Sequence, residues 1–126
     1  MRGPVICGVD GSELAARAVA VGLDLASTFR SDLVLVHVVS DEGERREGEL
    51  LLADAAVSAQ LGTSAERVVR VGDPAVELAR LAGERAAALL VVGTRGRGPL
   101  ASAVLGSVTL GLVEHAPCPV VVVPPR

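Results

Sequence analysis

The chain has 126 residues, a net charge of −3 and a hydrophobic content of 50%, so it is the size of one domain and can bury a core, which argues against a disordered chain. All twelve basic residues are Arg, and the absence of Lys excludes Schiff-base chemistry and a P-loop lysine. The acidic balance and the single aromatic residue, Phe29, argue against a nucleic-acid binder, which would use basic patches and aromatic stacking.

The first half of the chain predicts two strands with a helix between them. Residues 4–9 form a short apolar run that ends in the turn sequence Asp10-Gly11-Ser12. Apolar residues at steps of three and four then predict an amphipathic helix. Its expected core face is Leu14, Ala18, Val21, Leu25 and Phe29. Residues 33–39 are apolar without alternation, which predicts a strand buried on both faces.

A polar and strongly acidic stretch separates the second strand from the next helix. Residues 40–49 predict a solvated loop and the entry of this helix. The expected core face of the helix is Leu50, Ala53, Val57 and Leu61, with Gly62 as its stop. Residues 67–71 alternate between polar and apolar side chains, which predicts a strand at a sheet edge.

The remaining elements continue the alternation of strand and helix. Asp73 and Pro74 predict the N-cap and first position of a third helix, which contains Leu78 and Ala82. Residues 88–92 and 119–123 predict two more strands, and a last helix is expected to begin near residues 106–109. Strands joined by helices are parallel, with right-handed crossovers. We therefore predict one three-layer, doubly wound α/β domain over residues 1–126, with five parallel strands.

A glycine-rich segment follows the fourth strand. Ligands of open α/β sheets bind at the carboxyl ends of strands, where the strand order reverses. In Gly93-Thr94-Arg95-Gly96-Arg97-Gly98, the glycines let backbone N–H groups approach a ligand and the arginines add positive charge. Ser107 and Thr109 add hydroxyl groups to a helix N-terminus, which favours phosphate. An ordinary surface loop followed by a Ser N-cap is the alternative.

Asp10, after the first strand, also has two interpretations. A carboxylate there can accept hydrogen bonds from an adenine amine or a ribose hydroxyl. Alternatively, Asp10 or Ser12 caps the following helix, and the spacing of Asp10 and Glu13 fits a capping box. Both interpretations can hold at once.

Other nucleotide-binding and catalytic patterns are incomplete. A Walker A loop and a response-regulator receiver domain both require Lys. Residues 96–101 match the glycine pattern of dinucleotide-binding proteins, but they follow the fourth strand and contain a proline. His37 and His115 have no Ser or Cys partner at a recognisable spacing, and no set of metal ligands is evident. We therefore expect no catalytic residues, and at most weak ATP hydrolysis.

Cysteine content and hydropathy bear on where the protein works. Cys7 and Cys118 lie in apolar runs, so both are expected to be buried structural thiols. The chain has no charged-then-apolar signal segment and no apolar run of about 18 residues. We expect a cytoplasmic protein without a membrane partner.

The glycines match a known pattern. The spacing Gly93-x2-Gly96-x9-Gly106-Ser107 resembles the nucleotide-binding signature of the universal stress protein family at all four positions. Residues 9–12, 71–74 and 117–123 are also similar to that family, so the resemblance covers essentially the whole chain. The chain departs from the family in a shorter, more acidic connection after the second strand. It also has Arg95 where relatives often have His or another polar residue.

The resemblance implies a fold, a ligand and a partner. It implies strand order 3-2-1-4-5 in a fold of the adenine nucleotide alpha hydrolase type, a homodimer through residues 120–123, and ATP, AMP or ADP as ligand, often with Mg²⁺. Residues near 9, 10 and 38 are implied at the adenosine, and those at 93–96 and 106–109 at the ribose and phosphates. The implied binding residues are Val9, Asp10, Val38, Val92, Gly93, Arg95, Gly96, Gly106, Ser107, Val108 and Thr109.

The leading hypothesis is therefore an ATP-binding stress-response or signalling module. Two alternatives stay open. One is a slow ATPase, and the other is a stress protein that binds an unidentified protein partner and no nucleotide.

Overall fold

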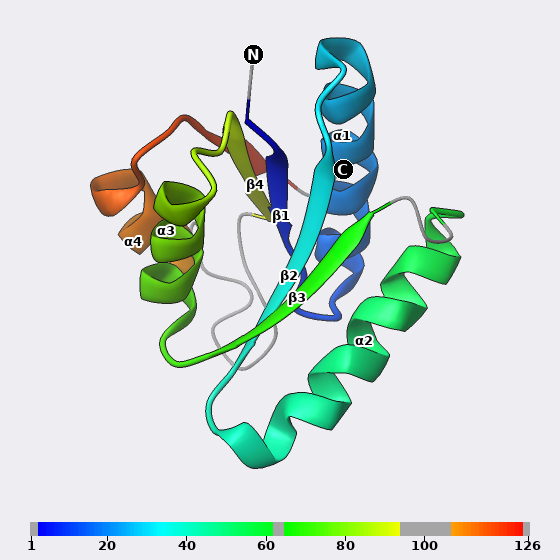
Figure 1. The fold of residues 1–126 in the computed structure, drawn as a ribbon, viewed down its shortest axis with the longest axis vertical. Coiled ribbons are helices and arrows are strands. Elements are labelled where there is room, and N and C mark those ends of the chain that lie inside the picture. Colours follow the sequence, from blue (N-terminus) through cyan, green and yellow to red (C-terminus); the bar gives the residue numbers. More distant parts are fainter. Residues whose placement is uncertain (1–2, 62–64, 94–106, 125–126) are drawn as a thin grey trace.

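The computed structural model describes residues 3–61, 65–93 and 107–124. Its five strands form one parallel sheet of order β3-β2-β1-β4-β5 (Figure 1), which confirms the predicted fold class and strand order. The elements are β1 (Val5–Gly8), α1 (Glu13–Phe29), β2 (Leu33–Val39), the 3₁₀ helix η1 (Glu42–Glu44), α2 (Arg45–Ser58), β3 (Glu66–Val71), α3 (Pro74–Glu84), β4 (Leu89–Gly93), α4 (Ser107–His115) and β5 (Val120–Val123).

Helices cover both faces of the sheet. α1 and α2 lie on one face, and α3 and α4 lie on the other (Figure 1). Because successive side chains of a strand point to opposite faces, β1 contributes to two aliphatic cores. Cys7 and Val9 pack in the core beneath α1 and α2, whereas Ile6 packs with Leu78 and Leu112 beneath α3 and α4.

The buried stripe of α1 differs from the predicted one. Its fully buried residues are Ala15, Ala18, Val19, Gly22 and Ala26. Phe29 was wrongly predicted to be in the core: it is 38% exposed, because it is the last residue of α1 and lies beyond the last buried position. Val21 and Leu25 pack at the margin of the core, and the side chain of Leu14 lies outside the described part of the chain.

α2 corrects the predicted core face. It begins at Arg45, within the stretch predicted to be a loop and helix entry, because Asp41 and Glu44 form a capping box around η1 that leads directly into the helix. Its buried residues are Gly48, Leu52 and Ala56. The predicted core residues Leu50 and Val57 are instead 57% and 73% exposed.

A glycine explains why α2 turns this face to the sheet. A Cβ at Gly48 would lie 3.2 Å from Val69 Cγ1 and 3.3 Å from His37 Cδ2, so the helix can approach the strands only where this side chain is missing. Leu61 is buried as expected, but it lies past the end of α2, and Gly62 lies outside the described residues.

The other local predictions are largely confirmed. Asp73 caps α3 through the N–H of Val76 at 3.1 Å, and Pro74 takes the first helical position. β3 lies at a sheet edge, as its alternation predicted.

The two cysteines differ in burial. Cys7 is buried, and burial raises the pKa of its thiol to about 12. Cys118 is only partly buried, which corrects the prediction that both thiols are buried. Within the described ranges, none of the helices has both the length and the hydropathy to cross a membrane.

Candidate functional site

β1 and β4 stop pairing at their carboxyl ends, where the strand order of the sheet reverses. The β1–β4 ladder ends at the pair Cys7 and Val91, but β1 stays paired with β2 one step further, and the N–H of Val9 donates to the carbonyl of Val36 at 2.8 Å. The end of β4, at Gly93, pairs instead with β5. The carboxyl ends of β1 and β4 therefore separate, and the space between them is where ligands of such sheets bind.

Asp10 lies at the end of β1, where the sequence placed a candidate carboxylate. Its Oδ1 accepts from the N–H of Ser12 at 2.9 Å, and Ser12 Oγ accepts from the N–H of Ala15 at 3.1 Å. The N-cap of α1 is therefore Ser12, and Asp10 holds the turn that precedes it. Gly11 has a φ of 84°, which explains a glycine at this position. Among the described residues, Asp10 Oδ2 has no hydrogen-bond partner.

His37 makes a contact that the sequence did not predict. Its Nδ1 lies 2.6 Å from the carbonyl oxygen of Val9. A carbonyl oxygen only accepts hydrogen bonds, so Nδ1 carries the hydrogen and donates it. The parallel register was the available signal, since the pair Gly8 and Val36 places His37 beside Val9 at the next step.

The valines of the candidate set lie on opposite faces of the sheet. Val38 and Val92 pack with the core beneath α3 and α4, and they flank the separated strand ends on that side. The side chain of Val9 is 5% exposed and packs beneath α1 and α2. A ligand on the α3 and α4 side would therefore meet the backbone of Val9 rather than its side chain.

α4 begins at Ser107, inside the range that the sequence predicted. Ser107 is exposed and Val108 is partly buried. Thr109 is 2% exposed, and its Oγ1 donates to the carbonyl of Gly93 at 2.8 Å. This hydroxyl was predicted to serve phosphate, but here its hydrogen is donated within the protein. It ties the first turn of α4 to the end of β4.

Close packing against α3 fixes the position of α4. A Cβ at Gly111 would lie 2.8 Å from Ala75 Cβ, so only glycine allows the two helices to approach this closely. Leu112 is fully buried beneath them. The first N–H groups of a helix have no partners within the helix, so the start of α4 can receive an anion beside Gly93. Arg95, Gly96 and Gly106 lie outside the described residues.

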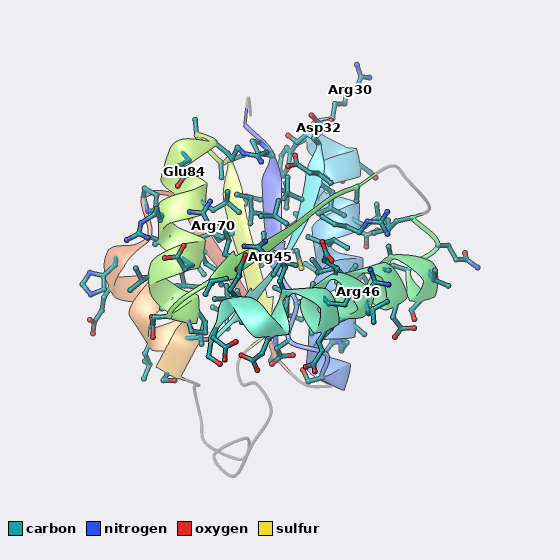
Figure 2. The ribbon with its side chains drawn as sticks, turned by 60° about the horizontal axis from the view of Figure 1, so that its bottom comes forward. Arg30, Asp32, Arg45, Arg46, Arg70 and Glu84 are labelled. Atoms are coloured by element: carbon teal, nitrogen blue, oxygen red, sulfur yellow. The ribbon has the colours of Figure 1, made fainter. Side chains whose placement is uncertain are left out.

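The main charged cluster lies away from these strand ends. Arg70 on β3 donates to both carboxylate oxygens of Glu84 at 3.1 and 2.9 Å and to Glu77 at 3.1 Å. Figure 2 shows Arg70 and Glu84 on β3 and α3. The hydrogen bonds with Glu84 raise the pKa of the Arg70 guanidinium and lower the pKa of the Glu84 carboxyl. Because every one of these charges is paired, the cluster stabilises the β3 edge and is not the candidate site.

A groove between α3 and α4 is separate from the strand ends. An open groove of about 500 Å³ lies between α3 and α4, lined by residues such as Ala79 and Gly111, and none of the candidate nucleotide-binding residues lines it. Within residues 3–61, 65–93 and 107–124, no three His, Cys, Asp or Glu side chains gather where they could hold a metal ion.

Comparison with known proteins gives one consistent family. The model of the universal stress protein family matches residues 1–124. The universal stress protein Rv2005c of Mycobacterium tuberculosis is 35% identical over 133 residues. That match covers 94% of this chain and 44% of Rv2005c, so the chain spans less than half of this relative.

Solved structures agree on the fold. A universal stress protein from Archaeoglobus fulgidus has a TM-score of 0.83 at 23% identity, and the match covers 98% of this chain and 99% of that one. A universal stress protein solved in complex with cAMP has a TM-score of 0.78 at 28% identity, with 96% of each chain covered.

Proposed function

The chain belongs to the universal stress protein family, and from this premise we propose that it binds ATP, or the related AMP or ADP, between the carboxyl ends of β1 and β4. The observation that carries the proposal is the separation of these strands. Asp10 lies on one side, and on the other the start of α4 is held against Gly93 by Thr109. The relative solved with cAMP supports an adenine nucleotide as the ligand class.

Each half of the nucleotide has matching chemistry in this arrangement. We assign the adenosine to Asp10 and the backbone of Val9 after β1, with Val38 of β2 and Val92 of β4 beside them. The Oδ2 of Asp10, which has no hydrogen-bond partner among the described residues, is a suitable acceptor for a ribose hydroxyl. On the β4 side, the N-terminus of α4 supplies N–H groups and partial positive charge for phosphate. The residues assigned to the phosphates are Gly93, Arg95, Gly96, Gly106, Ser107, Val108 and Thr109, and Thr109 would contribute its backbone N–H because its hydroxyl already donates to Gly93.

Mg²⁺ would accompany the phosphates rather than occupy a site made by the protein. It is commonly bound by substrate phosphates, water and one or two protein ligands. The described residues contain no cluster of three metal ligands, which fits this arrangement, and the exposed Ser107 hydroxyl is a candidate ligand. In our proposal the ion neutralises phosphate charge.

The role that follows is that of a binding module in a stress response. Nucleotide occupancy would change a surface that a second copy or another protein recognises. We propose β5 as the dimer contact, because it is an edge strand of the sheet among the described residues and an edge strand can extend the sheet into a partner. We place the protein in the cytoplasm, where adenine nucleotides are available.

Thermal unfolding with and without ATP and Mg²⁺ tests the proposal directly. A ligand at about 100 times its dissociation constant stabilises the folded state by about 2.7 kcal/mol, so Tm should rise in the wild type. Gly106→Asp should lose the rise, because it places a carboxylate in the proposed phosphate site. Gly83→Asp is the matched control. Gly83 is exposed near the C-terminal end of α3, so this variant should keep the full rise in Tm with ATP.

The same experiment separates the alternatives. An unchanged Tm in the wild type with ATP, ADP or AMP would contradict nucleotide binding and favour a protein that binds only other proteins. Phosphate release by the wild type above the Gly106→Asp background would favour the slow ATPase.

A further inference from the structure

The contact between His37 and Val9 has a consequence for Asp10, the next residue along the chain. The carbonyl of Val9 and the N–H of Asp10 belong to one peptide group. No cis peptide is present among the described residues, so this group is planar and trans, and the two bonds point in opposite directions. A side chain that fixes the Val9 carbonyl therefore fixes the direction of the Asp10 N–H.

The strand arrangement defines the direction of the Asp10 N–H. The Val9 carbonyl points toward His37 on β2, at 2.6 Å. The Asp10 N–H must then point away from β2, toward the side where β1 and β4 separate. Within the described residues this N–H has no hydrogen-bond partner. It is a donor directed at the proposed site.

His37 acts from the face of the sheet that does not carry the ligand. Its neighbours in β2, Val36 and Val38, pack with the core beneath α3 and α4, so the alternation of a strand turns His37 toward α2. The ring fits there because α2 has glycine at position 48, where a Cβ would lie 3.3 Å from His37 Cδ2. His37 therefore supports the site without lining it.

Two hydrogen bonds thus fix Asp10 from both ends. His37 holds the peptide that precedes it, and the Ser12 N–H holds its Oδ1 at 2.9 Å. The backbone N–H and the second carboxylate oxygen are left without partners among the described residues. We propose that His37 is a positioning residue that aims Asp10 at the ribose, so that the site selects nucleotides bearing free ribose hydroxyls. This inference rests on the proposed adenine nucleotide function.

The test compares binding of ATP and of 2′,3′-dideoxy-ATP, which lacks both ribose hydroxyls. The wild type should prefer ATP by about tenfold or more, the effect of one hydrogen bond to a charged group. His37→Val removes the donor and should weaken ATP binding by about tenfold while leaving dideoxy-ATP nearly unchanged. His37→Asn can place an amide N–H near the position of Nδ1, and it should restore the preference.

A double-mutant cycle shows whether His37 acts through Asp10. In an Asp10→Ala background, His37→Val should have no further effect on ATP affinity, because the group that it positions is gone. Unfolding without nucleotide, measured on all variants, corrects for any loss of folded protein.

The outcomes separate this inference from the proposed function. Wild-type protein that binds neither nucleotide refutes both. Wild-type protein that binds ATP and dideoxy-ATP equally keeps the proposed function and overturns the ribose role. If His37→Val keeps the wild-type preference, or weakens both ligands equally, His37 does not position Asp10 and the inference is wrong.

Discussion

The carboxyl ends of β1 and β4 are neighbours in the sheet order, but different elements hold them in place. The end of β1 is held by neighbours: His37 on the adjacent strand bonds to Val9, and Ser12 in the following turn bonds to Asp10. The end of β4 pairs with β5, and its Gly93 carbonyl is also held by Thr109 from a helix that begins at Ser107. The nucleoside half of the proposed site is therefore set by the sheet, and the phosphate half by the docking of α4.

This difference predicts which single hydrogen bond matters most for stability. Thr109→Val keeps the shape of the buried side chain but removes the donor, and it leaves the partly buried Gly93 carbonyl without this bond. We expect a loss of about 1–3 kcal/mol in the free energy of unfolding, measured with urea in the absence of nucleotide. ATP affinity should fall as well, because α4 loses its tie to the end of β4.

Thr109→Ser is the control, since it keeps the hydroxyl and should keep most of the stability and of the ATP affinity. If Thr109→Val were as stable as the wild type, packing between α3 and α4 alone would hold the helix, and the contrast between the two strand ends would disappear.

A smaller loss is expected at the end of β1. Ser12→Ala removes the N-cap of α1, which typically costs about 1 kcal/mol. Ser27→Ala tests the same substitution at an exposed position near the end of α1, and it should change stability little. The Ser12 N–H is a backbone group and remains available to Asp10, so ATP affinity should fall less than in Thr109→Val. A larger loss of ATP affinity in Ser12→Ala would mean that the cap, and not the sheet, sets the β1 side.

The hydrophobic pattern was sufficient for the strands and their parallel pairing, and the resemblance to the family supplied the strand order, but the pattern did not predict every helix face. Apolar runs locate strands directly, and crossovers by helices require parallel pairing. In α2, however, Leu50 and Val57 carried a strong hydrophobic signal and are exposed, whereas Gly48 carries none and faces the sheet. Close approach of a helix depends on a missing side chain, which a hydrophobic pattern does not register.

The candidate site was predictable to a similar extent. Asp10 and the start of α4 follow from the rule that ligands bind at strand ends, and both lie there. The contacts of His37 and Thr109 are not visible in the sequence, because each joins a side chain to a backbone carbonyl on another element. Such contacts depend on strand register and helix docking, which are known only once the fold is known.

The smallest effect on stability is expected for Asp10→Asn, and it separates folding from binding on the β1 side. Asn keeps an oxygen that can accept from the Ser12 N–H, so the free energy of unfolding should change by less than about 0.5 kcal/mol. Its amide group replaces Oδ2 with a donor, so a ribose hydroxyl loses its charged acceptor and ATP affinity should fall by about tenfold. Asp24→Asn, on the exposed face of α1, is the matched control and should change neither quantity. Urea unfolding and equilibrium ATP binding measured on the same preparations check both expectations. A loss of stability in Asp10→Asn as large as in Thr109→Val would show that the Asp10 charge holds the fold. Folding and ATP binding would then be coupled at the end of β1 as they are at the end of β4.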